Sequence, residues 1–449
     1  ATETLLKSNK QTFFKKTPTK KEVASLQEKH QAKNIKELQR VFELANHKKG
    51  PVHLNIPMEE PLYGMTTTPI PLPSRFKQAA INKKNDISKL QSLWSKAKRK
   101  MILVGVSNPD AALSSVLSLL LEDPSVVVLT EKTSNFSHPK AISAIDCLMA
   151  PLEIETQNQA DLQPDILITI GGMVVSKKIK FYLREHKAKN HFHLGKTTAN
   201  DTFFYLTQHI DAPAASTLSN LDMGDKSNYQ SNVLSHYNRY LETAAGYLKK
   251  VPFSDLRVFN MITTALPQNT HLQVANSSAV RYIQLFDLAT GTEVYCNRGT
   301  AGIDGSTATA IGAAQINTKQ TVLITGDLSF FYDINGLWNS YIPNDTRIIV
   351  INNQGGGIFR ILPGEKDTPK YDTYFETIHN RSARNVAKSF GLGYKRVQTN
   401  WGLKQALKAF FKPSTKSKIL EIYTPRKINN LVLLDYFKAM VKNELNLQL

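Results

Sequence analysis

An acid, an asparagine pair and three glycines stand at the ends of two neighbouring apolar segments. Asp327 follows the segment TVLITG, and Asn352 and Asn353 close the segment RIIVINN. Each segment is typical of a buried strand, and a right-handed crossover brings both strand ends to one edge of a parallel sheet. Open α/β sheets bind ligands in the crevice at that edge. We therefore expect Asp327 and the asparagines to converge on one ligand.

The residue types at this edge predict a metal ion and a diphosphate. A carboxylate, an amide oxygen and a backbone carbonyl are ligands that suit Mg²⁺, which completes its octahedron with water and phosphate oxygens. Asp327, one of the two asparagines and a nearby backbone carbonyl would hold the metal. Residues 355–357 are glycines, and we expect their exposed N–H groups and a following helix start to hold phosphate. Each feature alone would also fit an ordinary turn with Asp327 as a helix N-cap.

Other catalytic motifs are missing from the sequence. It contains no GxxxxGK[ST] phosphate loop, no GxSxG nucleophile elbow and no HExxH zinc motif. The two cysteines, Cys147 and Cys296, lie far apart, which argues against a disulfide framework and favours a reducing compartment. No apolar run could span a membrane and no signal peptide opens the sequence, so we expect a cytoplasmic protein without a membrane partner.

The formal net charge of +19 raises the possibility of nucleic-acid binding. The lysines, however, are spread along the chain, and their local clusters lack the interleaved aromatic residues of RNA-binding modules. A basic background also steers small anionic substrates toward a site. We expect no nucleic-acid partner, and keep nucleic-acid binding as an alternative that steep salt dependence would support.

Alternating strand and helix patterns predict an α/β protein with doubly wound parallel sheets. Residues 1–65 look like the end of a domain, with a helix over 35–45 and a strand at VHLNI. A proline-rich linker leads to an α/β unit at 75–210, and a polar connector at 211–252 leads to a second such unit at 253–449.

Three stretches carry a resemblance to a known family. The form GDLSFFYDINGL…NNQGGGIF is similar to the diphosphate-binding motif of thiamine-diphosphate enzymes. Together with VANSSAVRYIQLF at 274–286 and CNRGTAGIDGSTATAIGAA at 296–314, it resembles the family of 2-succinyl-5-enolpyruvyl-6-hydroxy-3-cyclohexene-1-carboxylate (SEPHCHC) synthase, from menaquinone biosynthesis. The resemblance spans nearly the whole chain.

The resemblance implies a fold and an activity. Residues 1–65 would be the remnant of a pyrimidine-binding domain, 75–210 a central Rossmann-like domain and 253–449 the diphosphate domain. The activity would be that of a transferase, which decarboxylates 2-oxoglutarate and adds the product to isochorismate, giving SEPHCHC and CO₂. The cofactors would be thiamine diphosphate and Mg²⁺ or Mn²⁺, and the cofactor position between subunits implies a homo-oligomer, either a dimer or a tetramer.

The resemblance also implies site residues. Ser277, Arg281 and Arg298 would bind substrate carboxylates, which suit the guanidinium fork, and Ile303 would be the apolar wedge that bends the cofactor. The other substrate contacts would be Lys177, Lys178, Ile358, Phe359 and Leu362. The cofactor contacts would be Asn276, Gly302, Ile303, Gly326, Asp327, Leu328, Ser329, Asn353, Gly355, Gly356, Gly357 and Ile358. The metal, Mg²⁺ or Mn²⁺, would be held by Asp327, Asn353 and Gly355.

One expected group has no counterpart in the sequence. Thiamine enzymes use a glutamate from the first domain to drive proton removal from the cofactor, and no glutamate of residues 1–65 lies in a matching context. We therefore expect that upstream residues are missing and that this chain alone is inactive. Two other possibilities stay open: another thiamine-diphosphate 2-keto-acid lyase or synthase, or a catalytically inactive cofactor-binding fragment.

Overall fold

The computed structural model of the 449-residue chain describes residues 19–48, 50–56, 86–195, 199–223, 227–361, 368 and 370–441. The chain divides into two compact units, Ala1–Asn85 and Asp86–Leu449. The first unit contains helix α3 (Lys20–Lys48), and the second contains two parallel sheets. The candidate site residues all belong to the second unit.

Helix α3 begins with a reciprocal cap, in which the Thr19 N–H donates to Glu22 Oε2 at 2.7 Å and the Glu22 N–H donates to Thr19 Oγ1 at 3.3 Å. Helix α3 contains the whole of the helix expected over 35–45, so this expectation is confirmed. The expected strand VHLNI is wrong, since residues 51–56 have no regular structure. An extended segment needs a partner strand, and no strand of the described first unit supplies one. The proline-rich linker lies outside the described residues.

The first sheet of the second unit has the strand order β2-β1-β3-β4-β5, and all its pairings are parallel. Its strands are β1 (Lys100–Val104), β2 (Val126–Thr130), β3 (Ile166–Ile170), β4 (Asn190–Leu194) and β5 (Leu206–Ile210). The first three are buried along their whole length, as both faces of a parallel sheet require. The helical elements of this part are α4 (Ser88–Lys96), α5 (Ala111–Leu120), η1 (Lys132–Ser134), α6 (Ile145–Ile154), η2 (Thr156–Asn158), α7 (Gln159–Leu162), α8 (Lys177–Glu185) and α9 (Ala214–Leu218).

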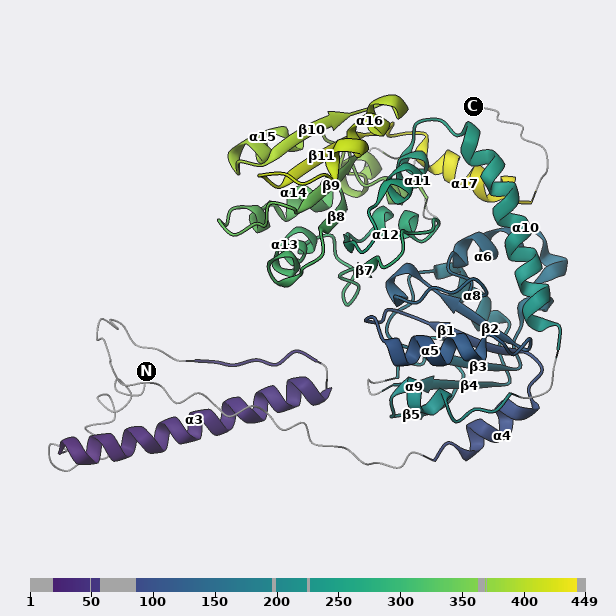
Figure 1. Cartoon of the computed structure of the whole chain (residues 1–449), viewed down its shortest axis with the longest axis horizontal. Helices are drawn as coiled ribbons and strands as arrows, with labels where there is room; N and C mark the ends of the chain where they lie inside the picture. The colour runs from purple at the N-terminus through teal and green to yellow at the C-terminus, as the bar shows by residue number, and fades with distance from the viewer. Residues whose placement is uncertain are drawn as a thin grey trace. The chain divides into compact units, whose positions relative to one another are not determined.

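The second sheet has the order β10-β11-β9-β8-β6-β7 and is also parallel throughout (Figure 1). Its strands are β6 (His271–Val274), β7 (Glu293–Tyr295), β8 (Thr321–Gly326), β9 (Arg347–Asn352), β10 (Gly393–Val397) and β11 (Lys418–Tyr423). The helical elements are α11 (Asp255–Ala265), α12 (Ser278–Ile283), α13 (Ser306–Ile316), α14 (Asp327–Tyr332), η3 (Ile334–Leu337), η4 (Gly357–Arg360), the π-helical turn η5 (Tyr371–Phe375), α15 (Ala383–Ser389), α16 (Asn400–Phe410) and α17 (Asn429–Ala439). The doubly wound α/β architecture is thus confirmed.

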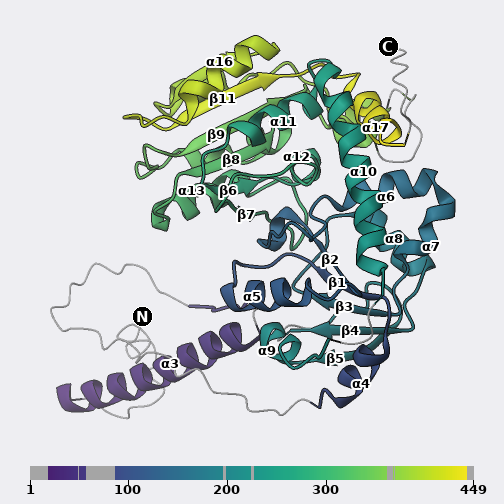
Figure 2. The same cartoon turned by 45° about the vertical axis from the view of Figure 1, so that its right-hand side comes forward.

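The polar connector expected at 211–252 contains α10 (Tyr229–Lys250), which runs along both sheet layers in Figures 1 and 2. Its buried tyrosines join the two layers. The Tyr237 hydroxyl accepts from the Ala144 N–H at 3.2 Å beside α6, and the Tyr247 hydroxyl donates to the Val432 carbonyl at 3.1 Å in α17. The connector is therefore part of the core as well as a link.

The two layers also meet directly. The Lys132 N–H donates to Gln284 Oε1 at 2.6 Å, and the Asn135 side chain exchanges two hydrogen bonds with the backbone of Val294. Both cysteines are unpaired thiols. In the described part of the chain, no helix is both long and apolar enough to cross a lipid bilayer.

Candidate functional site at the ends of β8 and β9

The two strands that carry the acid and the asparagine pair are neighbours. β8 and β9 pair in parallel, with Gly326 opposite Ile351, so their carboxyl ends share one edge of the sheet. Asp327 is buried as the first residue of α14, and its Oδ2 accepts the Gly355 N–H at 3.0 Å. Its Oδ2 also lies 3.3 Å from His379 Nε2. The expected convergence of these strand ends is confirmed.

The two ends of the Asn353 amide have different environments. Its Nδ2 donates to Asp255 Oδ2 at 3.0 Å, whereas its Oδ1 is buried and has no hydrogen-bond partner among the residues that the structure describes. A buried polar atom without a partner is costly unless a ligand satisfies it. A hard oxygen beside a buried carboxylate fits Mg²⁺, so the residues present agree with the predicted metal.

Asp255 was not found from the sequence. It is the first residue of α11, after the N-cap Ser254, and its Oδ1 accepts from the Thr424 hydroxyl at 2.6 Å. Burial raises the pKa of Asp255 to about 6, and the hydrogen bonds from Thr424 and Asn353 act against that rise. The only local signal is an ordinary helix start, because the partners of Asp255 lie far away in sequence.

Asn352, the other asparagine of the pair, has a different environment. Its Nδ2 donates to Glu421 Oε1 at 2.8 Å and to the Arg381 carbonyl at 3.0 Å, and its Oδ1 accepts the Gln354 N–H at 3.1 Å. Both ends of this amide are therefore satisfied within the protein. Of the two asparagines, only Asn353 offers an oxygen to a ligand.

The glycine loop differs from the expected phosphate cradle. The N–H groups of Gly355, Gly356 and Gly357 donate to Asp327 Oδ2, the Glu376 carbonyl and the Gly355 carbonyl, respectively. The expectation that these donors are exposed is wrong, and a single 3₁₀ turn, η4, stands where the helix start was expected. The glycines instead allow the backbone of the loop to lie close to the backbone of neighbouring residues. Gly355 has φ +152°, and a Cβ there would lie 2.6 Å from the Glu376 carbonyl oxygen.

Glu376 anchors this loop and was also missed. Its carboxylate is fully buried and accepts from Arg360 Nε at 2.7 Å and from Arg426 Nη1 at 2.9 Å. A buried carboxylate with two arginine partners is held firmly in place. The backbone carbonyl of Glu376 accepts the Gly356 N–H at 2.6 Å, so the anchored residue also holds the glycine loop in place.

Asn276 joins the other two family-like stretches. It is buried, and its Nδ2 donates to the carbonyls of Asn297 at 2.5 Å and Gly302 at 2.6 Å. Its Oδ1 accepts from Arg298 Nη1 at 2.9 Å. The side chain therefore orients the strand end that carries Arg298 and the turn that carries Gly302, and its role as a cofactor contact stays a prediction.

The predicted wedge Ile303 connects to the GD motif through Ser329. The Ser329 hydroxyl donates to the Ile303 carbonyl at 2.5 Å, and the Ile303 side chain is half-buried. A Cβ added at Gly326 or Gly302 would meet no atom within 4 Å, so neither glycine is needed for packing within the chain. Leu328, which is half-buried, follows Asp327 in α14. Ser329 thus joins the GD motif to the Ile303 turn, and the roles of these residues as cofactor contacts stay predictions.

The predicted carboxylate-binding residues combine a strained backbone at Ser277 with buried guanidinium donors at Arg281 and Arg298. Ser277 has φ +73°, a strained conformation for a residue with a side chain, directly before α12. The Nε atoms of Arg281 and Arg298 are buried and have no partner in the described part of the chain. Burial lowers the pKa of Arg281. Unsatisfied guanidinium donors in a partly buried place fit anionic substrates.

Two acids of the first sheet layer lie around Arg281. Glu131, Asp146, Ser176 and Arg281 line one small enclosed cavity between the layers. Glu131 accepts the Val175 and Ser176 N–H groups at 2.7 Å each, and Asp146 accepts the Ser176 hydroxyl at 2.5 Å. Burial raises the pKa of Glu131 to about 7 and also raises the pKa of Asp146. Neither acid was identified from the sequence.

The predicted lysines lie at the start of α8. Lys177 is exposed, and Lys178 forms an ion pair with Glu153. A third lysine, Lys180, donates to the Val174 carbonyl at 2.9 Å. Burial lowers the pKa of Lys180, Glu131 acts against that shift, and Arg298 adds to it. Lys180 is therefore a further candidate for anion binding, while the roles of Lys177 and Lys178 stay predictions.

The predicted apolar contacts follow the glycine loop. Ile358 is buried, and Phe359 is half-buried with its ring edge-on to Phe375 at a centroid distance of 5.8 Å. Leu362 lies outside the described residues. Phe375 is itself 54% exposed, so this contact lies near the surface, and the roles of Ile358 and Phe359 as substrate contacts stay predictions.

Comparisons with known proteins assign most of the second sheet to a domain family. Residues 277–422 match the model of the thiamine pyrophosphate enzyme family, C-terminal TPP binding domain. This match contains the GD motif, the asparagine pair and the glycine loop, so thiamine pyrophosphate (thiamine diphosphate) is the cofactor of this domain.

Several relatives match most of the chain. A protein of Flavobacterium psychrophilum is 43% identical over 429 residues, which cover 93% of this chain and 76% of the relative. One of Flavobacterium johnsoniae is 41% identical, with the same coverage. One of Bacteroides fragilis is 33% identical over 410 residues, 89% of this chain and 72% of the relative. All three are named 2-succinyl-5-enolpyruvyl-6-hydroxy-3-cyclohexene-1-carboxylate synthase. The chain therefore belongs to the SEPHCHC synthase family of thiamine-diphosphate enzymes.

Proposed function

We propose that the protein acts as a SEPHCHC synthase, which decarboxylates 2-oxoglutarate and adds the resulting four-carbon unit to isochorismate. The single observation that carries the site assignment is the buried Oδ1 of Asn353, which has no partner among the described residues and lies two residues before Gly355, whose N–H donates to Asp327. Family membership and the names of the relatives support the reaction.

Asp327 and Asn353 would hold the metal ion, with the Gly355 carbonyl as a further ligand. An octahedral Mg²⁺ takes its remaining ligands from water and phosphate oxygens, and Mn²⁺ is the alternative ion. Asp255 orients the Asn353 amide so that its oxygen faces the ligand. When bound, thiamine diphosphate supplies a carbon nucleophile for the keto group and a place for the electron pair left when CO₂ departs.

The substrates are dianions, and the basic groups between the layers suit them. Arg281 and Arg298 each have a buried Nε that finds no partner among the described residues, and each would bind a carboxylate in a fork. Asn276 orients Arg298 through the 2.9 Å hydrogen bond. Ser277, strained before α12, would add a hydroxyl contact. The acids Glu131 and Asp146 set the electrostatic environment of Arg281 from the other side.

Three further properties stay predictions. A homodimer or tetramer, a cytoplasmic location and the identity of the divalent ion follow from the family resemblance and the ligand chemistry. The substrate contacts of Lys177, Lys178, Ile358, Phe359 and Leu362 and the wedge role of Ile303 have the same basis.

An omission assay tests the proposal. Isochorismate absorbance is followed with 2-oxoglutarate, thiamine diphosphate and Mg²⁺, and each component is left out in turn. The protein expressed from its complete reading frame and the 449-residue chain are assayed side by side. We expect the protein from its complete reading frame to consume isochorismate only when all three components are present. If the folded protein consumes pyruvate but not 2-oxoglutarate, it is another thiamine-diphosphate synthase and the proposal is wrong.

A further inference from the structure

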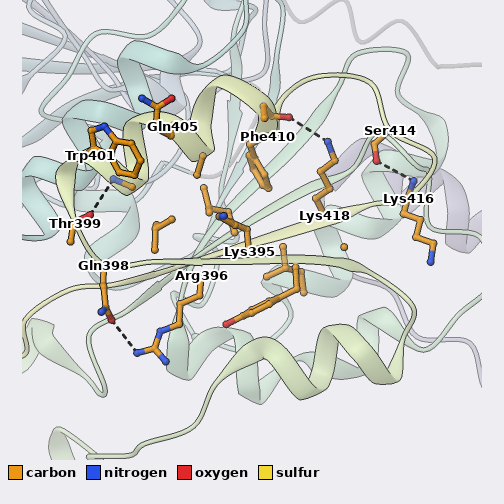
Figure 3. A pocket seen from close by; sticks show the side chains of 18 of the residues that line it. Lys395, Arg396, Gln398, Thr399, Trp401, Gln405, Phe410, Ser414, Lys416 and Lys418 are labelled. Atoms are coloured by element: carbon orange, nitrogen blue, oxygen red, sulfur yellow. Dashed lines mark hydrogen bonds between the residues drawn. The ribbon is translucent and has the colours of Figure 1, made fainter.

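A groove lies beside the outermost strand of the second sheet, away from the cofactor residues. It has a volume of about 1000 Å³ and runs between α16 and the strands β10 and β11. Figure 3 shows Trp401 and Gln405 on the helix side, Lys395 between helix and strands, and Lys416 and Lys418 toward the other end. A space of this size accommodates a ligand of several hundred daltons or a short peptide.

The groove exists because the helix presents small side chains there. Gly402, Ala406 and Ala409 lie along one side of α16, and all three line the groove. The larger residues of α16, such as Leu403 and Leu407, are buried against the sheet. Val397 and Phe410, almost fully buried, form part of the floor. Helix α16 therefore packs on the sheet through its larger side chains, and its small side chains leave a channel beside β10.

Strand β10 is a free sheet edge. It ends the strand order and pairs with β11 alone among the described strands. The Gly393 N–H donates toward β11, to the Ser417 carbonyl at 2.9 Å. Because N–H directions alternate along a strand, the N–H groups of Tyr394 and Arg396 face the open edge. An extended chain could pair with them.

The surroundings of the groove are uniformly basic. Residues 393–418 contain no Asp or Glu, and their basic residues are Lys395, Arg396, Lys404, Lys408, Lys412, Lys416 and Lys418. Lys395 and Lys416 are exposed, and no side-chain partner of either is found in the described part of the chain. Trp401, 74% exposed, gives the groove an aromatic wall. An anionic partner with some apolar side chains is the complement of such a surface.

We propose that this groove binds an extended acidic segment of another protein, which adds to β10 as a further strand. Its backbone pairs with Tyr394 and Arg396, its acidic side chains lie on the α16 side and face Lys395 and Lys416, and its apolar side chains lie on the opposite face of the sheet. Addition of a strand beside a helix is a known mode of peptide recognition. This inference rests on the sheet edge and its charge, and is independent of the proposed reaction.

The binding test uses two labelled peptides with the 449-residue chain. The first is a nine-residue peptide in which Glu alternates with Val or Thr. The second has the same charge but has proline at alternate positions, so that it cannot form ladder hydrogen bonds. Fluorescence anisotropy should show saturable binding of the first and binding of the second that is weaker by about tenfold or more. Equal binding of both would overturn the added strand.

A pair of variants isolates the backbone contact. Arg396→Pro and Arg396→Ala both remove the guanidinium, which stacks on Tyr423 at 3.8 Å. Only proline also removes the outward N–H, and proline is tolerated at an edge position where the N–H faces solvent. We expect Arg396→Pro to bind the alternating peptide about tenfold more weakly than Arg396→Ala. Equal affinities in variants with matching melting curves would contradict the proposal.

Charge is tested separately. Lys395→Glu with Lys416→Glu should abolish peptide binding, whereas Lys96→Glu with Lys98→Glu, exposed lysines elsewhere in the same unit, should leave it unchanged. An equal loss in both double variants would show net-charge attraction only.

Hydrogen exchange on the unaltered chain needs no variant. The alternating peptide should slow exchange of the amides in 393–397. No protection at saturating peptide, or tighter binding of RNA or anionic vesicles that competes with the peptide, would overturn the assignment of an acidic protein segment as the partner.

Discussion

The Asn353 amide nitrogen donates to the buried carboxylate of Asp255 at 3.0 Å, and the amide oxygen has no partner in the described part of the chain. The two residues are 98 positions apart. In the proposed site, Asp255 is thus a positioning residue for the metal ligand Asn353. Without it, the Asn353 amide could rotate and offer nitrogen instead of oxygen.

Asp255→Ala should therefore weaken Mg²⁺-dependent binding of thiamine diphosphate by about tenfold or more, since a mispositioned metal ligand costs that much. Asp255→Asn should retain more of the affinity, because its side-chain oxygen can still accept from Asn353. Calorimetric titration of cofactor into Mg²⁺-loaded protein measures the difference. Unchanged affinity in a folded Asp255→Ala variant would show that the hydrogen bond has no role at the site.

Gly326 and Gly355 should respond differently to alanine. A Cβ at Gly326 meets nothing within 4 Å, so Gly326→Ala should leave the free energy of unfolding nearly unchanged and weaken cofactor binding. A Cβ at Gly355 would lie 2.6 Å from a backbone oxygen, at φ +152°, so Gly355→Ala should lower the free energy of unfolding by about 1–3 kcal/mol. Urea unfolding without cofactor and calorimetry separate the effects. Full cofactor affinity in Gly326→Ala would place the cofactor elsewhere.

Glu131 should make stability depend on pH. Burial raises its pKa from an ordinary 4.5 to about 7, so the folded state binds a proton more tightly than the unfolded state. Its contribution is fully present below about pH 4.5 and is lost as the pH rises through 7. Glu131→Gln cannot titrate and should show a smaller fall in the free energy of unfolding over this range. Parallel slopes for the two proteins would contradict the raised pKa.

Arg281→Ala should raise the KM for a substrate. A guanidinium that binds a carboxylate contributes roughly 1.5–3 kcal/mol, which corresponds to a rise in KM of about tenfold to a hundredfold. Arg184→Ala serves as the control, because Arg184 donates to the Thr202 carbonyl, outside the candidate site. Steady-state kinetics with varied 2-oxoglutarate, then isochorismate, show which substrate is affected. An unchanged KM for both would remove Arg281 from the substrate contacts.

The sequence predicted that these strand ends meet because the signals for the two strands are local. TVLITG and RIIVINN each contain a mainly apolar strand, and a parallel sheet brings the carboxyl ends of neighbouring strands to one edge. Asp255 and Glu376 could not be found in this way. Each acts through partners distant in sequence, Asn353 and Thr424 for Asp255, and Arg426 for Glu376.

Other differences have equally plain causes. Strand β10 was not predicted from the sequence. It reads GYKRV, and this edge strand has neither an apolar run nor a clear alternation of apolar and polar residues. The glycine loop was expected to present its N–H groups to phosphate, yet those groups satisfy oxygens of Asp327, Gly355 and Glu376. Backbone hydrogen-bond partners in a loop depend on its path, which three glycines leave open.

The adjacent asparagines give the most direct test of the central claim, that Asp327 and Asn353 hold thiamine diphosphate through a divalent ion. Cofactor affinity is measured by calorimetry, with Mg²⁺ and with EDTA, for the protein from its complete reading frame and for Asn353→Ala and Asn352→Ala. We expect Asn353→Ala to lose most of the Mg²⁺-dependent affinity while its unfolding changes little. Asn352→Ala should lose stability instead, because three hydrogen bonds of its amide are broken. Wild-type affinity in Asn353→Ala, or binding that EDTA does not change, would contradict the account.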